Sequence, residues 1–369
     1  MATATRSTEP KAPGVPDGSE HELLLVRRGR RTGAHVIIAV HSTVLGPALG
    51  GCRLWHYESL QEAVTDALRL SSAMTLKAAA AQLPLGGGKA VIFPPRELDL
   101  TGRSREALLE DFADSLNMLG GTYITAEDVG MGAADMDFLC ERSDHVVGAP
   151  TAHGGSGDPG AFTATGVLGA IRACVRSVYG TRELSGRSVA VVGVGHVGEP
   201  LARALAEAGA GLVLSDVDPA KAALAAELGA AWLEPEDALR ADVDLLAPCA
   251  LGGVIDPSLS LELNARIVCG SANNQLAGPE IASVLAARGI LYAPDFIVNS
   301  GGLINVAMEL TGYDRRLALE RIGRIEGVLG AILLRAKEAG VTPLAAAERI
   351  ATERIAAKAA EAHGLRDAA

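Results

Sequence analysis

Two lysines and an aspartate in the first part of the chain are residue types that carry out acid–base chemistry. Lys77 precedes a run of four alanines, and Lys89 follows twelve residues later, between three glycines and the apolar segment 90–93. Lysine usually lies at the surface. Burial among apolar residues lowers its pKa from about 10.4 toward about 7–8, where it exchanges protons at neutral pH. Asp128 adds a carboxylate that accepts a proton. Local sequence alone also allows two surface lysines and a turn aspartate.

A glycine-rich turn in the second half of the chain has the spacing of a dinucleotide-binding site. Gly193, Gly195 and Gly198 form the pattern G-x-G-x-x-G, and the intervening residues are Val194, His196 and Val197. The pattern stands between a predicted strand, 188–192, and a predicted helix, about 197–208, as nucleotide binding requires. Asp216 ends the next predicted strand, where a carboxylate accepts a hydrogen bond from the ribose 2′-hydroxyl and repels a 2′-phosphate. NAD is therefore favoured as the cofactor. The nearby Lys221 could contact a 2′-phosphate, so NADP is an alternative cofactor. The other alternative is that the glycine-rich turn binds no ligand.

The elements that would position the lysines and the aspartate alternate between strands and helices. Two apolar runs, 23–26 and 34–41, predict a β-hairpin. A capping box at 59–62 begins a helix that should end near Leu83 and Pro84. After it, the glycine run 86–88 predicts a turn into a strand at 90–93, followed by a helix at 104–119 and a strand at 123–126. This alternation predicts an α/β domain.

A glycine-rich stretch at 153–160 predicts the boundary with a second α/β unit. A helix over about 161–179 leads into that unit. Strands are predicted at 188–192, 212–215, 243–246, 266–269 and 291–293, with helices between several of them. From 315 to 362 the sequence is almost wholly helical, divided at 340–343. The predicted fold class is therefore α/β with two domains and C-terminal helices.

Composition excludes several classes of function. The 369 residues suggest two domains, and the net charge of −11 provides no basic surface for nucleic acid or anionic lipid. No uncharged segment is long and apolar enough to span a membrane. Eight histidines without metal-ligand spacing predict no metal. Five cysteines without a C-x-x-C pair, and no signal peptide, predict a reducing cytoplasm. Residues 1–20 are predicted to be a flexible tail.

Eight sequence blocks, taken in order, resemble one enzyme family. They are 45–53, 74–77, 85–89, 125–130, 193–198, 247–253, 270–276 and 293–302. Over roughly residues 33–350 the chain resembles the glutamate/leucine/phenylalanine/valine dehydrogenase superfamily, and most of all its leucine and valine dehydrogenase branch. The resemblance implies a substrate-binding and oligomerisation domain at 21–152, completed by about 343–369, and a Rossmann-type NAD-binding domain at 153–342. It also implies a homo-oligomer.

The resemblance further implies a role for each matching residue. Lys77 would hold the substrate α-carboxylate beside the backbone of Gly50 and Gly51. Lys89 would be the lysine of depressed pKa that activates water, and Asp128 would carry protons to and from the substrate nitrogen. The nicotinamide ribose would lie against Asn273 and the backbone of Ala247, Cys249 and Ala250, and the substrate side chain against Leu49, Ala126, Leu303 and Val306. The reaction would convert an L-amino acid, NAD and water reversibly into a 2-oxo acid, ammonium and NADH.

The four residues implied for the side-chain pocket are uncharged, so a branched-chain amino acid is predicted and glutamate is not. Leu303 stands where leucine dehydrogenases usually have valine and some phenylalanine dehydrogenases have alanine, and its bulk favours the smaller aliphatic substrates. Phenylalanine dehydrogenase activity remains an alternative within the family. Two further alternatives are a catalytically inactive NAD-binding relative and a hydroxy-acid dehydrogenase, although the latter usually relies on a catalytic histidine.

Overall fold

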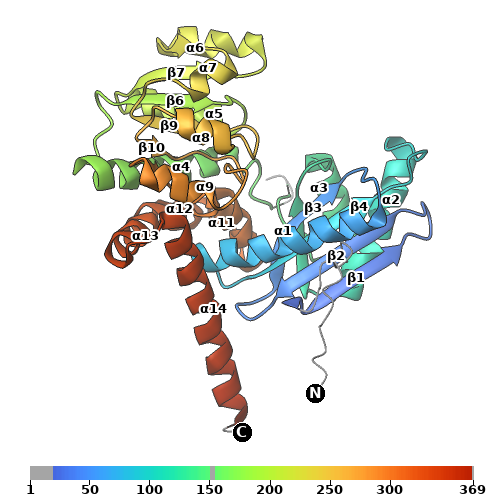
Figure 1. Cartoon of the computed structure of the whole chain (residues 1–369). Coiled ribbons are helices and arrows are strands. Elements are labelled where there is room, and N and C mark those ends of the chain that lie inside the picture. Colours follow the sequence, from blue (N-terminus) through green and yellow to red (C-terminus); the bar gives the residue numbers. More distant parts are fainter. Residues whose placement is uncertain (1–19, 150–153, 368–369) are drawn as a thin grey trace, which may run out of the picture.

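The computed structural model describes residues 20–149 and 154–367, and side chains up to residue 361. Nearly all of the predicted tail, 1–20, and the predicted boundary at 152/153 lie outside the described residues. The described chain forms two β-sheets with helices packed on them, one built from residues 23–127 and the other from residues 188–292 (Figure 1). The predicted α/β class is confirmed.

The first sheet is mixed. Its strands are β1 (Leu23–Arg28), β2 (His35–Ser42), β3 (Ala48–Leu54), β4 (Gly86–Phe93) and β5 (Tyr123–Glu127), in the order β1-β2-β4-β3-β5. β1 and β4 pair antiparallel with β2, whereas β3 is parallel to both β4 and β5. Helix α1 (Leu60–Ala80) packs its apolar side on β2 and β4. Helices α2 (Gly102–Met118) and α3 (Ala133–Cys140) cover the other face.

The prediction that residues 86–88 form a turn is wrong, because all three glycines lie within β4. Each lacks space for a side chain. A Cβ on Gly86 would stand 1.9 Å from the carbonyl oxygen of Ser42. A Cβ on Gly87 would stand 2.1 Å from the backbone nitrogen of Thr75, and a Cβ on Gly88 would stand 2.6 Å from the ring of Tyr123. The glycines therefore allow α1 and the neighbouring strands to approach β4 closely, which brings Lys77 and Lys89 together.

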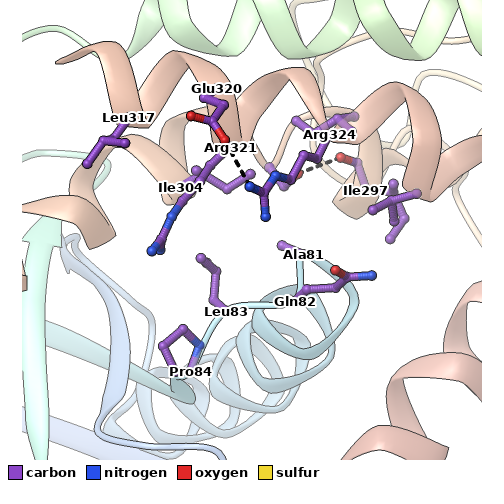
Figure 2. A pocket seen from close by; sticks show the side chains of 13 residues that line it. Ala81, Gln82, Leu83, Pro84, Ile297, Ile304, Leu317, Glu320, Arg321 and Arg324 are labelled. Atoms are coloured by element: carbon purple, nitrogen blue, oxygen red, sulfur yellow. Dashed lines mark hydrogen bonds and ion pairs between the residues drawn. The ribbon is translucent and has the colours of Figure 1, made fainter. Parts of the chain in front are cut away.

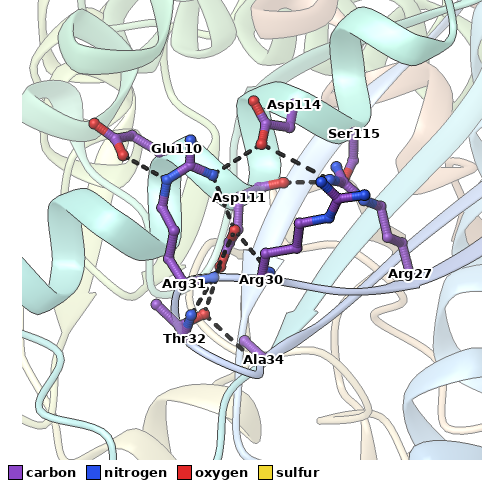
Figure 3. A network of polar contacts seen from close by, with 9 residues as sticks. All are labelled: Arg27, Arg30, Arg31, Thr32, Ala34, Glu110, Asp111, Asp114 and Ser115. Atoms are coloured by element: carbon purple, nitrogen blue, oxygen red, sulfur yellow. Dashed lines mark hydrogen bonds and ion pairs between the residues drawn. The ribbon is translucent and has the colours of Figure 1, made fainter.

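The turn between β1 and β2 is attached to α2 by a buried carboxylate (Figure 3). Asp111 accepts hydrogen bonds from the backbone N–H groups of Arg30, Arg31 and Thr32 and, at 2.8 Å, from the Thr32 hydroxyl. Burial raises the pKa of Asp111, but these hydrogen bonds more than offset it, so the pKa lies below its usual value. The sheet and α2 are thus held as one rigid support.

The second sheet is wholly parallel. Its strands are β6 (Ser188–Val192), β7 (Gly211–Ser215), β8 (Ala231–Trp232), β9 (Leu245–Pro248), β10 (Ile267–Val268) and β11 (Leu291–Tyr292), in the order β11-β10-β9-β6-β7-β8. This is the doubly wound order, in which ligands bind at the carboxyl ends of the strands beside β6. The long helix α4 (Gly160–Tyr179) precedes the sheet. Shorter helices follow its strands: α5 (Gly198–Glu207), α6 (Ala222–Leu228), α7 (Pro235–Leu239), α8 (Pro257–Glu262) and α9 (Ile281–Ala287).

The C-terminal part of the chain is helical and returns to the first sheet's helix. It contains α10 (Asp295–Val298), α11 (Gly301–Ala307), η4 (Met308–Thr311), α12 (Arg315–Gly323), α13 (Ile325–Ala339) and α14 (Pro343–Asp367). Figure 1 shows α14 as a long helix that extends away from both sheets. Arg354 on α14 donates hydrogen bonds to the carbonyls of Ala79, at 2.7 Å, and Leu83, at 3.0 Å, and so caps the end of α1. No helix in the described part of the chain has the length and apolarity to cross a membrane.

Candidate active site

Lys89 and Asp128 form an ion pair at the centre of the candidate site. Lys89 lies within β4 and is only 6% exposed, and Asp128 directly follows β5. The Lys89 ammonium donates a hydrogen bond to Asp128 Oδ2 at 2.5 Å. Burial raises the pKa of Asp128, but the positive charges and hydrogen bonds of Lys89 and Arg53 outweigh this effect and hold the pKa below its usual value. Asp128 is therefore an anion that shares a hydrogen with a buried amine.

Lys77 lies in the last turn of α1, where the negative end of the helix dipole favours a cation. Burial nevertheless lowers the pKa of Lys77 to about 8. The positive charge of Lys89 lowers it further, whereas the carboxylates of Asp295 and Asp128 raise it. Burial is therefore the main cause of the depressed pKa. At neutral pH Lys77 is a partly buried cation, which suits it to hold a carboxylate.

Gly50 and Gly51 lie in β3 beside the Lys89–Asp128 ion pair, and neither has room for a side chain. A Cβ at Gly50 would stand 1.8 Å from the carbonyl oxygen of Gly88, and one at Gly51 would stand 2.8 Å from the Cβ of Asp128. The Tyr123 hydroxyl donates to the Gly50 carbonyl at 2.5 Å. The backbone at both positions is thus held against the strand that carries Lys89 and against Asp128.

The four residues expected to contact the substrate side chain belong to one hydrophobic cluster, although they come from both parts of the chain. Leu49 on β3, and Leu303 and Val306 on α11, are 2%, 8% and 8% exposed, and the partly buried Ala126 on β5 packs against the same cluster. A Cβ at Gly148 would stand 4.0 Å from Val306, which places α11 beside the segment that leaves the first sheet. Leu49 pairs with Gly87, two residues before Lys89, and Ala126 lies two residues before Asp128, so these two apolar side chains adjoin the Lys89–Asp128 pair.

The glycine-rich turn has the geometry that a dinucleotide requires. Gly193 has a φ of +98°, which favours glycine, and Gly198 lies so close to it that a Cβ at Gly198 would meet the Gly193 carbonyl oxygen at 1.8 Å. A Cβ at Gly195, by contrast, would meet nothing within 4 Å, so its backbone faces open space where a pyrophosphate fits. Helix α5 begins at Gly198 and directs its N-terminal N–H groups toward this turn. These residues fit a dinucleotide.

The other residues expected to hold the cofactor surround that turn. Asp216, just after β7, accepts a hydrogen bond from the Val194 N–H at 2.8 Å, and the exposed His196 lies 3.3 Å from Asp158.

At the end of β9, the Ala250 Cβ lies 2.6 Å from where a Cβ of Gly193 would be, and the Cys249 N–H donates to the Val192 carbonyl. Asn273, beyond β10, accepts a hydrogen bond from the Asn299 side chain at 2.8 Å. All lie at the carboxyl ends of the parallel strands, whereas Ala247 is buried within β9.

A cavity of about 480 Å³ lies elsewhere, between the turn that ends α1 and helices α10 to α13. Figure 2 shows Leu83 and Pro84 on one side of it and Arg321 and Arg324 on the other. Its lining includes none of Lys77, Lys89 and Asp128, so this cavity is separate from the candidate site.

The structure adds three charged residues that the sequence did not single out. Arg53 on β3 donates a hydrogen bond to Asp128 Oδ2 at 3.1 Å. Asp295 is buried near Lys77 and accepts a hydrogen bond from the Gln275 N–H. Glu309 accepts from the N–H groups of Gly148 and Ser156 and so fixes both sides of the connection between the sheets. Arg53 and Asp295 lie inside blocks 45–53 and 293–302, but only their surroundings in the fold indicate what they contact.

A doubly wound parallel sheet with this turn, together with a buried Lys–Asp pair and a second lysine, is the combination expected of a dinucleotide-dependent dehydrogenase. Residues 25–145 match the family model for the Glu/Leu/Phe/Val dehydrogenase dimerisation domain, and residues 214–364 match the model for glutamate/leucine/phenylalanine/valine dehydrogenase.

Individual relatives match almost the whole chain. Leucine dehydrogenase of Geobacillus stearothermophilus is 42% identical over 91% of both proteins. Valine dehydrogenase of Streptomyces virginiae is 42% identical over 92% of this chain and 95% of its own. The crystal structure of L-tryptophan dehydrogenase from Nostoc punctiforme superimposes with a TM-score of 0.81 at 40% identity, covering 92% of this chain and 97% of that one. The chain belongs to the Glu/Leu/Phe/Val dehydrogenase family and is an NAD(P)-dependent type of amino-acid dehydrogenase.

Proposed function

We propose that this protein catalyses the NAD-dependent, reversible oxidative deamination of a branched-chain aliphatic L-amino acid. The observation that carries the proposal is the Lys89–Asp128 ion pair, placed next to Lys77 and an uncharged apolar cluster. The cation of Lys77 suits the substrate α-carboxylate, the apolar cluster suits an aliphatic side chain, and the ion pair suits proton transfer between them.

The order of proton transfers follows from the chemistry of an amino acid. Its ammonium must lose a proton before the α-carbon can release a hydride, because the nitrogen lone pair forms the iminium. Asp128 is held as an anion and accepts that proton. When bound, the nicotinamide cofactor accepts the hydride. Water then adds to the iminium carbon. Asp128 first releases the substrate proton to solvent and then takes the proton of Lys89 across their hydrogen bond, so the neutral Lys89 amine removes a proton from the water. Asp128 next returns its proton to the nitrogen, and ammonia leaves as the new hydroxyl group loses its proton, which gives the 2-oxo acid.

NAD is the proposed cofactor rather than NADP. Asp216 stands at the end of β7, where its negative charge opposes a 2′-phosphate and its oxygens suit a 2′-hydroxyl. Lys221, the cation that would favour NADP, has its ammonium 3.9 Å from the Glu199 carboxylate. That partner weakens the case for a phosphate contact at Lys221.

The apolar cluster supports valine, leucine or isoleucine as the substrate. Burying the side-chain carboxylate of glutamate against Leu49, Leu303 and Val306 would leave a charge without a partner, which is costly. One methylene group changes binding by only about 1–3 kcal/mol, so several aliphatic substrates should be accepted. The named relatives include leucine and valine dehydrogenases, which agrees with this range.

We further propose that the chain works as a homo-oligomer in a reducing cytoplasm, with its domains divided near 152/153 and the first domain completed by α14. The match of residues 25–145 to a dimerisation domain supports the oligomer. All five cysteines are free, as a reducing compartment favours. The hydrogen bonds from Arg354 to the end of α1 support the assignment of α14.

The experiment that tests this function is a panel of L-amino acids assayed for NADH and NADPH formation with the purified protein. The expected result is the highest kcat/KM for a branched-chain substrate with NAD, weak activity with phenylalanine and none with glutamate. A higher kcat/KM for phenylalanine than for every branched-chain substrate would contradict the substrate assignment. A preference for NADP would contradict the cofactor assignment. Binding of NADH without turnover of any L-amino acid would show an inactive relative.

A further inference from the structure

Arg53 stands between the Lys89–Asp128 pair and a second charged residue, Asp66 on α1. Its Nε donates a hydrogen bond to Asp128 Oδ2 at 3.1 Å, and a terminal nitrogen donates to Asp66 Oδ2 at 2.8 Å. The guanidinium therefore bridges two carboxylates, one beside the proposed reacting groups and one on α1. A planar guanidinium makes two such contacts at fixed angles, which a lysine cannot reproduce.

Asp66 is itself held in place. Its Oδ2 accepts a second hydrogen bond from the Tyr57 hydroxyl at 2.7 Å, and its Oδ1 accepts one from Arg69 at 2.8 Å. Burial raises the pKa of Asp66, but the hydrogen bonds and charges of Tyr57, Arg69 and Arg53 bring it below its usual value. Asp66 is therefore a fixed anion that holds Arg53 from the side away from Asp128.

The two oxygens of Asp128 have different surroundings. Oδ2 receives hydrogen bonds from both Lys89 and Arg53, whereas Oδ1 receives none from any residue whose contacts the structure describes. Asp128 is 25% exposed at its side chain, so Oδ1 is open to a ligand. With both cations on one oxygen, the carboxylate has one oxygen fixed and one oxygen available to take a proton.

We propose that Arg53 is a positioning residue for deamination: by holding Asp128 Oδ2 beside Lys89, it keeps the carboxylate ionised and turned so that Oδ1 accepts the proton of the substrate ammonium. This inference rests on the function proposed above. Arg53 does not touch the substrate and acts only through Asp128.

Several other titratable groups lie around Asp128 and set the background against which Arg53 acts. They are Lys89 on β4, Cys52 on β3, Lys77 on α1 and Tyr123 on β5. Burial raises the pKa of Cys52 and of Tyr123, so both are neutral near neutral pH. The positive charge next to Asp128 therefore comes from the two lysines and Arg53.

The test compares Arg53→Gln with the wild-type protein over a range of pH. In the pH profile of kcat, activity should fall at low pH as Asp128 gains a proton; this fall is the acidic limb of the profile. Losing a neighbouring arginine should move the acidic limb upward by about one pH unit. The kcat for L-leucine should fall by about tenfold or more, because a hydrogen bond to a charged group is lost. The KM should change little, since Lys77 still holds the carboxylate. Arg96→Gln is the matched control, because Arg96 pairs with Glu58 at the surface and should leave the profile unchanged.

Two further variants separate charge from geometry. Arg53→Lys restores a positive charge without the two-sided bridge, so it should return the acidic limb toward wild type while kcat stays low. Arg53→Ala leaves a space that opens onto a cavity of about 530 Å³ lined by Arg53, Trp55, Tyr57 and Asp66, among others. Guanidinium ions at concentrations that do not unfold the protein should enter this cavity and partly restore kcat.

The outcomes distinguish this inference from the proposed function. A wild-type protein that forms no NADH from any L-amino acid would refute the function itself. If the wild type is active, and Arg53→Gln binds NADH normally yet keeps the wild-type kcat and acidic limb, the role of Arg53 is refuted. If Arg53→Gln does not fold, an Arg53→Lys variant with wild-type kcat refutes it equally. A variant whose only change is a lower Tm would also overturn the proposal.

Discussion

The pKa of Lys77 leads to a sharp prediction for substrate binding. Burial lowers this pKa from 10.5 to about 8, which corresponds to about 3 kcal/mol against the charged form. Lys77 should therefore be a cation below pH 8 and lose its charge above it. If its charge anchors the substrate carboxylate, the affinity for a carboxylate ligand should fall about tenfold per pH unit above 8.

The assay uses an inhibitor whose own charge does not change. The 3-methylbutanoate ion resembles valine without its amine and stays ionised from pH 7 to 10, so its competitive inhibition constant reports on the protein alone. We expect this constant to be flat below pH 8 and to rise above it. In Lys77→Arg the guanidinium keeps its charge, so the rise should disappear. An inhibition constant that stays flat to pH 10 in the wild type would refute the anchoring role.

The same shift has a consequence for stability, because the pKa of Lys77 is lower in the folded protein than in the unfolded chain. Between pH 8 and 10.5 the unfolded chain binds more protons, so the contribution of Lys77 to the free energy of unfolding rises with pH across this window. Below pH 8 the whole cost of burying the cation is present. Lys77→Met should therefore raise the Tm at pH 7 more than at pH 10, as differential scanning calorimetry would measure.

Three substitutions test other parts of the site. Lys89→Ala should lower kcat by about a hundredfold or more through loss of the general base, while NADH binding measured by fluorescence persists; near-normal turnover would contradict the assignment. Asp216→Ala should raise the KM for NAD and reduce discrimination against NADP, whereas the exposed neighbour Asp218→Ala should not. Equal cofactor preference in both variants would remove Asp216 from the ribose site. Leu303→Ala should increase kcat/KM for phenylalanine relative to valine, with Leu310→Ala, an exposed leucine, as the control; an unchanged ratio would place Leu303 outside the pocket.

Several features can be predicted from the sequence because they depend on local pattern. The glycine turn at 193–198 stands between a strand predicted at 188–192, which the structure matches residue for residue, and a helix. The strands predicted at 243–246 and 266–269 differ from the observed β9 and β10 by one or two residues at their ends, because an apolar run carries no sharp boundary. Local periodicity is therefore a good guide to which elements exist and a weaker guide to their ends.

Other features depend on contacts across the fold and cannot be inferred from the sequence alone. Strand β3 is not predicted, because Gly50 and Gly51 weaken any strand pattern and are needed only where β4 and Asp128 approach. The bridge from Arg53 to Asp66 joins β3 to α1 through side chains. The charge of Asp295 on α10 acts on Lys77 on α1, although the two residues lie far apart in the sequence. Such pairings follow from tertiary packing, which spacing along one chain does not encode.

The most direct test of the proposed reaction follows one hydrogen atom. The protein is incubated with L-leucine deuterated at the α-carbon and NAD, and the products are analysed by mass spectrometry and an ammonium assay. We expect NADH carrying one deuterium, formed in equal amounts with ammonium and the 2-oxo acid. NADH without deuterium, or with no matching ammonium, would contradict hydride transfer from the α-carbon of an aliphatic amino acid at this site.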